Sequence, residues 1–285
     1  MDTRPFPLSA EDIRRQVQAA LEEDVGDGDQ TARLIPAEAT AQAGVMVREA
    51  AVLCGQPWFD AVFQLLDDAV AVHWHAREGD WMAPGQRVAT LTGLARPLLT
   101  GERTALNFLQ TLSAVATVTR RFVEAVAGLP VHIVDTRKTL PGLRLAEKYA
   151  VRAGGGTNHR LGLFDGILIK ENHVAAAGSV RAALEQAHRL APPGIFVQVE
   201  VESLWQLEEA LEAGATLILL DNMGCDQLAE AVRLTAGRAV LEASGGVTLA
   251  SVQAIARTGV QRISIGSLTK DINATDYSMR FQIDE

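Results

Sequence analysis

From Val131 onward, short apolar runs alternate with polar tips and with amphipathic segments. The runs are rich in Val, Ile and Leu and nearly continuous, which is typical of strands buried on both faces of a parallel sheet. We predict six strands, at residues 131–138, 166–172, 195–202, 216–223, 240–246 and 262–267. Apolar residues between the later strands recur at helical spacing and predict helices near 180–190, 204–213, 227–235 and 249–257. This alternation indicates an α/β fold whose sheet is covered by helices.

The number of strands limits the architecture. Six strands are fewer than the eight of a complete (β/α)₈ barrel. We therefore predict an incomplete, six- to seven-stranded α/β barrel. An open, doubly wound parallel sheet is the alternative fold.

The first half of the chain has a different pattern of apolar and polar residues. Ser9 and Asp12 are spaced as a helix N-cap pair, and Ile13, Val17 and Leu21 give the following segment one apolar face. Residues 41–100 read as strands and turns, and residues 101–127 read as one long helix. The first half thus predicts a separate layer of strands and helices.

Composition restricts the class of protein. The chain has 285 residues, of which 48% are hydrophobic, so it can bury a sizeable core. Its net charge of −9 does not favour nucleic acid or an anionic membrane as partner. The two cysteines, Cys54 and Cys225, form no close pair, and we see neither a signal peptide nor a membrane span. These features predict a cytoplasmic protein.

Positive charge is concentrated in one part of this acidic chain. Residues 135–170 contain seven Lys or Arg residues and only three Asp or Glu residues. Such an island indicates a small, highly charged anionic ligand. An ion-paired surface patch is the alternative explanation.

The strand tips carry the candidate chemistry, because ligands in parallel α/β folds bind at the carboxyl ends of strands. These tips, in chain order, hold cationic, acidic and then glycine-rich groups: Arg137, Lys138, Lys170, Glu200, Glu202, Asp221, Asn222, Ser244, Gly245, Gly246, Gly266 and Ser267.

Each group of tips predicts one kind of contact. The cations, joined by His159 and Arg160 of GGGTNHR, suit carboxylates, which Arg binds through two parallel hydrogen bonds. Glu200 and Asp221 could hold Mg²⁺ or ribose hydroxyls, or could simply pair with nearby lysines. The glycines let backbone N–H groups approach a phosphate.

Taken together, the motifs resemble one family. The segments DTRKTLPGLR, GGGTNHR, LIKENH, VEVES, LLDNM, LEASGG and IGSLTK, preceded by EDVGDGDQT and ERTALNFLQ, occur in the order found in quinolinate phosphoribosyltransferases. The resemblance covers almost the whole chain. It implies an N-terminal α/β sandwich domain at residues 1–112, joined by residues 272–285, and a barrel domain at residues 113–271.

The resemblance also implies an activity. Members of the family transfer a phosphoribosyl group from phosphoribosyl diphosphate to quinolinate with Mg²⁺. They release diphosphate and CO₂ and form nicotinate mononucleotide. They are homodimers, in which Arg103 would reach the site of the other subunit.

Further roles follow from the resemblance, residue by residue. Arg137, His159 and Arg160 would bind the two quinolinate carboxylates, with Lys138 and Lys170 beside them. Lys138, Lys170, Glu200 and Asp221 would be catalytic, and the two acids would hold the metal directly, through water or by way of the ribose. The 5′-phosphate would lie against Ser244, Gly245, Gly246, Gly266 and Ser267. The role of Lys270 is left open.

Three alternatives stay open at this point. Lys170, at a strand tip, could form a Schiff base in an aldolase or lyase. A related phosphoribosyltransferase could use nicotinate or another altered substrate. The first half of the chain could be a binding module without catalysis, which would leave the positive island unexplained.

Overall fold

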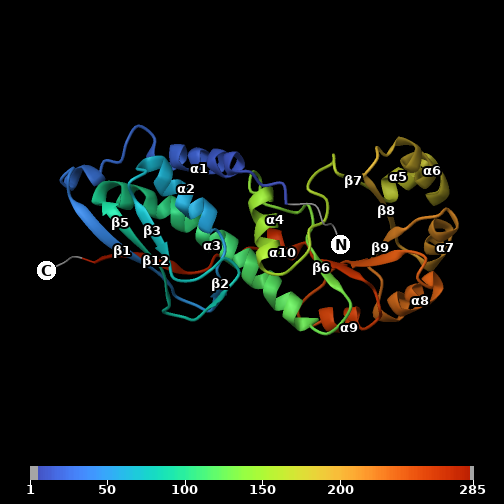
Figure 1. Ribbon diagram of the computed structural model, residues 1–285. Helices are drawn as coiled ribbons and strands as arrows, with labels where there is room; N and C mark the ends of the chain where they lie inside the picture. Colours follow the sequence, from blue (N-terminus) through green and yellow to red (C-terminus); the bar gives the residue numbers. More distant parts are fainter. Residues whose placement is uncertain (1–5, 283–285) are drawn as a thin grey trace. The chain divides into compact units, whose positions relative to one another are not determined.

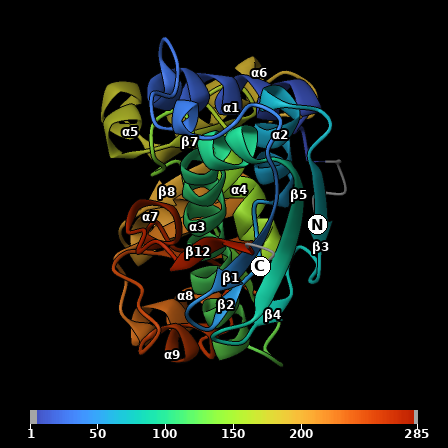
Figure 2. The same ribbon diagram turned by 90° about the vertical axis from the view of Figure 1, so that its left-hand side faces the viewer.

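The computed structural model describes residues 6–282, which form two units (Figures 1 and 2). One unit contains the chain up to Val118, Leu140–Gly155 and the segment from Asp271 onward. The other contains Thr119–Thr139 and Gly156–Lys270. The domain limits implied by the family resemblance, near residues 112 and 272, stay a prediction.

The first unit is built on an antiparallel sheet with the strand order β12-β1-β5-β3. Its strands are β1 (Thr40–Val47), β3 (Ala71–Trp74), β5 (Arg87–Leu94) and β12 (Tyr277–Gln282). A two-stranded ribbon of β2 (Ala51–Val52) and β4 (Trp81–Met82) accompanies it. The last strand of the described chain therefore pairs with the first, in a register that sets Val47 opposite Tyr277.

Helices accompany this sheet in the first unit (Figures 1 and 2). They are α1 (Ala10–Val25), α2 (Gln56–Leu66), α4 (Arg144–Ala153) and the first part of α3 (Ala95–Ala125), with a short 3₁₀ turn at Ala32–Leu34. Ser9 caps α1 by accepting a hydrogen bond from the Asp12 N–H (3.1 Å), which confirms the expected cap. Gly101 of α3 is so close to Phe63 of α2 that a Cβ would lie 2.8 Å from the ring. That contact requires glycine.

Helix α2 was not anticipated, because residues 41–100 were expected to hold strands and turns. Its buried residues, Trp58, Phe59, Val62 and Phe63, have helical spacing. The Phe59 ring packs against Trp74 of β3 (5.1 Å between centroids), so α2 covers the sheet. Aromatic and β-branched residues also favour strands, and an 11-residue amphipathic run is easily misread for that reason.

A buried polar cluster joins distant segments of the first unit. Ser113 of α3 bonds both backbone groups of Cys54 (3.0 and 3.1 Å) and shares a hydrogen bond with the Tyr277 hydroxyl (2.9 Å). Glu78 accepts the N–H of Gly55 (2.7 Å) at the start of α2. Burial and the neighbouring Glu78 raise the pKa of the Cys54 thiol well above its usual range, so this cysteine is protonated and unreactive. The cluster therefore serves packing and not chemistry.

The second unit contains a parallel sheet with the strand order β6-β11-β10-β9-β8-β7, which confirms the predicted α/β fold. Its strands are β6 (His132–Val134), β7 (Gly166–Ile169), β8 (Phe196–Val201), β9 (Leu217–Asp221), β10 (Val240–Ser244) and β11 (Arg262–Ser264). Its helices are α5 (Glu171–Ala177), α6 (Val180–Leu190), α7 (Leu204–Glu212), α8 (Cys225–Thr235), α9 (Val252–Ala256) and α10 (Ser267–Lys270).

The strand order separates the two predicted architectures. Strands β7 to β11 follow one another around the sheet without a reversal, so right-handed crossovers place the helices on one side. Helices α6, α7 and α8 accordingly pack in sequence along the outside of the strands (Figure 1). A doubly wound sheet would reverse direction and carry helices on both faces. Strands β6 and β7 are not paired with each other in the described chain, so the unit is an incomplete barrel.

A short segment extends the sheet beside β6. Thr157 forms a parallel bridge with Val134, donating its N–H to Ile133 O (2.8 Å) and accepting the Asp135 N–H (3.1 Å). This bridge positions the backbone of the residues that follow it, including His159.

No helix within residues 6–282 has the length and apolar character needed to cross a membrane.

Glu147 of α4 is a buried carboxyl group in the first unit. It accepts the N–H of Leu140 (3.2 Å to one oxygen), which ties the preceding loop to the helix. Burial raises the pKa of Glu147 to about 8, against the opposing effects of this hydrogen bond and of Arg144. The native protein therefore keeps a proton that the unfolded chain loses at lower pH.

This difference predicts how stability depends on pH. Because the native pKa lies above the unfolded value, the stabilisation is present at acidic pH and is lost as pH rises toward 8. The slope from one such group is at most about 1.4 kcal/mol per pH unit. We expect Glu147→Gln, which stays neutral, to unfold with a smaller loss of stability between about pH 5 and 8. Urea unfolding of both proteins across this range measures the two slopes, and equal slopes would contradict the assignment.

Candidate active site

The carboxyl ends of the six parallel strands bring the predicted site residues of the second unit to one edge of the sheet. Arg137 and Lys138 follow β6, Lys170 follows β7 and Glu200 lies near the end of β8. The other ends hold Asp221 on β9, Ser244, Gly245 and Gly246 at β10, and Gly266 and Ser267 after β11. Arg103 belongs to α3 of the first unit and is exposed, so its predicted reach into a neighbouring subunit stays a prediction.

Arg160 is the most buried of the site cations, with 9% of its surface exposed. Its Nη1 donates to Gly166 O (2.8 Å), at the first residue of β7. Burial lowers the pKa of Arg160, and the charge of Arg137 lowers it further, whereas Asp165 acts in the opposite direction. Two guanidinium groups are therefore held close enough to repel each other, an arrangement that a bound anion relieves.

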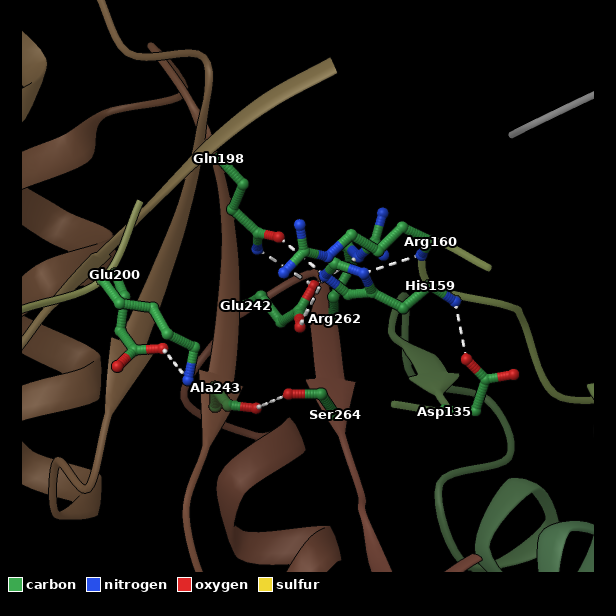
Figure 3. Close-up of polar contacts among 10 residues, drawn as sticks. Asp135, His159, Arg160, Gln198, Glu200, Glu242, Ala243, Arg262 and Ser264 are labelled. Atoms are coloured by element: carbon green, nitrogen blue, oxygen red, sulfur yellow. Dashed lines mark hydrogen bonds and ion pairs between the residues drawn. The ribbon is translucent and has the colours of Figure 1, made fainter. Parts of the chain in front are cut away.

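His159 lies beside Arg160 with the same low exposure, 9%. Its backbone N–H donates to Asp135 (2.8 Å), a fully buried carboxylate after β6 (Figure 3). The ring is also held, because Nδ1 lies 2.7 Å from the Arg160 backbone N–H and Nε2 lies 2.7 Å from Gln198 Oε1.

The acidic part of the site contains an ion pair. Lys170 Nζ lies 3.5 Å from Glu200 Oε2, with the lysine side chain 48% exposed and the glutamate side chain 10% exposed. This is the lysine–carboxylate pairing that we considered as an alternative to ligand binding. Burial raises the pKa of Glu200, Lys170 lowers it, and the nearby charges of Asp221 and Glu171 raise it. Glu200 and Asp221 are thus close enough to interact.

This acid pair fits the chemistry of Mg²⁺. The ion is usually held by one or two carboxylates together with substrate phosphates and water, and a divalent cation would offset the repulsion between Glu200 and Asp221. Residues 6–282 contain no cluster of three or more His, Cys, Asp or Glu residues able to hold a metal ion by themselves. His73 of β3 and His75, which follows that strand, belong to no such cluster, although their ring centroids lie 4.9 Å apart. Mg²⁺ at Glu200 and Asp221 would accordingly need oxygens from the substrate.

A cavity of about 230 Å³ lies next to Glu200 of this acid pair. It is lined by Glu171, Val174, Ala175, Glu200, Glu202 and Gln206. Three carboxylates around it disfavour an anionic substrate. The cations and glycines of the strand ends are therefore the better binding surface for one.

The glycines after β10 form a turn that only glycine can build. Gly245 has φ +111°, and a Cβ there would lie 2.2 Å from Asn222 Oδ1. Gly246 has φ +55° and open space around it. The helix expected directly beyond these glycines begins only at Val252. The turn itself, and not a helix end, is the candidate phosphate contact.

The glycine after β11 lies against the first of the site lysines. A Cβ on Gly266 would be 2.9 Å from Lys138 Cδ and 3.7 Å from its Nζ. The Thr269 hydroxyl donates to Lys138 O (2.7 Å) and holds the backbone there. Residues 128 positions apart in the sequence, a cation and a glycine that both suit phosphate, thus lie side by side.

A buried layer beneath the strand ends was not identified from the sequence. It consists of Gln198 on β8, Glu242 on β10 and Arg262 on β11. Glu242 is fully buried and lies 2.8 Å from Arg262 Nε (Figure 3). The available signal was a polar residue two positions before a predicted site residue, since Gln198 shares a strand face with Glu200, and Glu242 with Ser244.

Comparison with known proteins places this geometry in a family. Residues 29–113 match "Quinolinate phosphoribosyl transferase, N-terminal domain", and residues 115–280 match the C-terminal domain of the same family. A protein of Bacillus subtilis described as "Probable nicotinate-nucleotide pyrophosphorylase [carboxylating]" is 44% identical over 257 residues, which cover 90% of this chain and 89% of that protein.

Two further relatives support the same family. "Quinolinate phosphoribosyltransferase [decarboxylating] 2a, mitochondrial" of Nicotiana tabacum is 37% identical, over 98% of this chain and 85% of that protein. The solved structure of the nicotinate-nucleotide pyrophosphorylase from Francisella tularensis is 41% identical and superposes with a TM-score of 0.94, covering 97% of this chain and 98% of that one. The chain belongs to the quinolinate phosphoribosyltransferase family.

Proposed function

We infer that this protein transfers the phosphoribosyl group of phosphoribosyl diphosphate to quinolinate and releases diphosphate and CO₂, forming nicotinate mononucleotide for NAD biosynthesis. The observation that carries this inference is the interaction of Arg137 with Arg160, in which the charge of Arg137 lowers the pKa of the buried Arg160. A substrate with two carboxylates offers one partner to each guanidinium. The names of the relatives, which are 37–44% identical, support the same reaction.

In this proposal, different groups of site residues bind different parts of the substrates. Arg137 and Arg160, beside Lys138 and Lys170, bind the quinolinate carboxylates. The turn at Gly245 and Gly246, with Gly266 and Ser267, takes the 5′-phosphate. Lys138, which lies against Gly266, is placed to neutralise phosphate charge on the same side.

The chemistry depends on where charge develops. As diphosphate leaves, positive charge grows at C1′ of the ribose, and carboxylates such as Glu200 and Asp221 favour it. Mg²⁺ held at Glu200 and Asp221 would neutralise the departing diphosphate. The pyridine nitrogen attacks C1′, and the cationic ring then stabilises the carbanion left when the adjacent carboxylate departs as CO₂. Positioning and electrostatics supply the rate, with no covalent intermediate on the protein.

We further propose that the active protein is a homodimer, with Arg103 of each subunit completing the site of the other. The support is the exposed position of Arg103 on α3 together with the family assignment. The acidic surface disfavours nucleic acid as a partner. A cytoplasmic location is part of the same proposal and is supported by two cysteines that form no disulfide.

Two rival reactions differ in what they need from the site. A Schiff base at Lys170 would require a neutral amine in apolar or cationic surroundings, and Lys170 is instead half exposed beside Glu200. A nicotinate-specific transferase would present one carboxylate to two arginines. The decarboxylating reaction on a dicarboxylate is therefore favoured over both.

A turnover assay tests the reaction itself. We expect CO₂ and nicotinate mononucleotide in equal amounts from quinolinate, phosphoribosyl diphosphate and Mg²⁺, and no product when nicotinate replaces quinolinate. Removing Mg²⁺ with a chelator should abolish turnover. Product from nicotinate, or trapping of Lys170 by borohydride with a carbonyl substrate, would support the rival reactions instead.

Removal of one guanidinium tests the dicarboxylate site. A charge-assisted hydrogen bond is worth about 1.5–3 kcal/mol, so Arg137→Ala should raise the KM for quinolinate about ten- to hundredfold. The KM for phosphoribosyl diphosphate should change little. Arg189→Ala, which removes an exposed arginine at the end of α6, is the matched control. Normal quinolinate affinity in Arg137→Ala would argue strongly against the assignment.

A methyl group at Gly245 tests the phosphate turn. Gly245→Ala places a Cβ against Asn222 and should displace the turn, raising the KM for phosphoribosyl diphosphate more than that for quinolinate. Gly237→Ala is the control, because Gly237 also has a positive φ (+77°) but has open space around it. Each substitution at a positive φ costs about 1 kcal/mol of stability from strain alone. Equal kinetic effects of the two variants would contradict a phosphate role for the turn.

A further inference from the structure

Glu242 is a charge buried in the middle of a strand. Its side chain on β10 is fully buried, and the sheet register sets it directly opposite Arg262 of β11. The Arg262 Nε lies 2.8 Å from Glu242 Oε2. Buried ion pairs rarely stabilise a fold more than well-packed apolar residues would, so stability alone does not explain this one.

The hydrogen bonds above Glu242 run in one direction. The backbone N–H of Arg160 can only donate, so His159 Nδ1, 2.7 Å away, must accept and carries no proton. The ring proton is therefore on Nε2 and is donated to Gln198 Oε1 (2.7 Å). The amide of Gln198 fits this tautomer, because its Nε2 donates to Glu242 Oε2 (3.2 Å) and its Oε1 is left to accept from His159. Figure 3 shows the chain from Glu242 through Gln198 and His159 to Arg160.

Gln198 forms a hydrogen bond with the Glu242 carboxylate, donating from Nε2 to Oε2 (3.2 Å). Arg262 Nε forms an ion pair with the same oxygen, and the other oxygen lies 3.8 Å from His159 Nε2, whose proton is donated to Gln198. Because a carboxylate can only accept, Gln198 must turn its NH₂ group toward Glu242 and its Oε1 toward His159. A glutamine at residue 242 could donate as well as accept, so it would no longer fix the orientation of the Gln198 amide.

The series of hydrogen bonds that starts at Glu242 ends at Arg160, which we propose binds the substrate. Arg160 is anchored at its backbone by the His159 ring and at its guanidinium by Gly166 O (2.8 Å). The remaining guanidinium N–H groups are then presented in a fixed orientation. Both ring nitrogens of His159 make hydrogen bonds within the protein, which assigns the ring a role in orienting Arg160.

We propose that Glu242 is a positioning residue for the dicarboxylate substrate: by orienting Gln198 it stabilises the Nε2-protonated tautomer of His159, the tautomer that accepts the Arg160 N–H, and it thereby helps to hold Arg160. The proposal rests on the proposed function for its kinetic consequence. Its structural part, the tautomer of His159, can be measured whether or not quinolinate is the substrate. Glu242 touches no substrate atom in this scheme.

The kinetic test is Glu242→Gln in the full-length protein. Loss of an oriented charge-assisted contact predicts about a tenfold rise in the KM for quinolinate, with the KM for phosphoribosyl diphosphate within about threefold of wild type. Ser264→Ala is the matched control. Ser264 is a buried polar residue of the neighbouring strand whose hydroxyl donates to Ala243 O (3.4 Å), and it takes no part in the hydrogen bonds that link Glu242 to Arg160. Equal changes in both KM values would overturn the proposal.

Coupling to Arg160 separates positioning from a general structural effect. If Glu242 acts through Arg160, Glu242→Gln should add little to the rise in quinolinate KM already caused by Arg160→Ala. Independent, multiplicative effects in the double variant would overturn the proposal. If Glu242→Gln does not fold, Gln198→Leu is the substitute variant. It removes the hydrogen bonds of Gln198 to His159 and Glu242 and keeps the ion pair between Glu242 and Arg262. The same rise in the KM for quinolinate is then expected.

The spectroscopic test reads the ring directly. In ¹⁵N-labelled protein, His159, assigned by its loss in His159→Gln, should show the pattern of a ring protonated at Nε2. Glu242→Gln should shift the His159 signals, and Ser264→Ala should leave them in place. An unchanged His159 spectrum in Glu242→Gln would overturn the proposal even if turnover is lost. If wild type does not turn over quinolinate, the proposed function fails while this readout still decides the role of Glu242.

Discussion

The repulsion between Arg137 and Arg160 is the interaction on which the candidate site of the second unit depends. Arg137 follows β6, and Arg160 follows the Thr157 bridge beside β6, so the chain brings the two cations together at one edge of the sheet. Burial increases the cost of that proximity, because less water screens the charges. The unit holds Arg160 at two points, its backbone N–H and its guanidinium. A bound dianion would offset this repulsion.

Below this edge lies a layer that is polar but closed. Gln198 and Glu242 are fully buried at positions inside the incomplete barrel that apolar side chains usually fill, and the Arg262 side chain beside them is 22% exposed. Their hydrogen bonds transmit orientation upward to His159 and Arg160. The same strands therefore carry both sets of residues: Gln198 and Glu242 lie inside the barrel, and the candidate site residues Glu200 and Ser244 lie two positions further along β8 and β10.

Much of the fold, and the position of many candidate site residues at strand ends, could be predicted from the sequence for physical reasons. Buried parallel strands are continuous apolar runs, so β7 to β11 were found together with the polar residues at their ends. Helix α2 was missed because Trp58, Phe59 and Phe63 suit a strand as well as a helix, and only packing on β3 decides between them. The role of Glu242 was missed because hydrogen-bond direction depends on which residues meet across strands, and Gln198 and Glu242 are 44 positions apart.

The pairing of β12 with β1 has a consequence for synthesis of the protein. Strand β1 is complete once residue 47 has been made, but its neighbour on one side consists of residues 277–282. Between them the ribosome must produce the whole second unit, whose strands pair mostly with near neighbours in the chain. The later-made unit can thus finish folding first, while the edge of β1 stays open to other strands. That edge closes only when β12 pairs with it, and the same pairing brings the Tyr277 hydroxyl to Ser113.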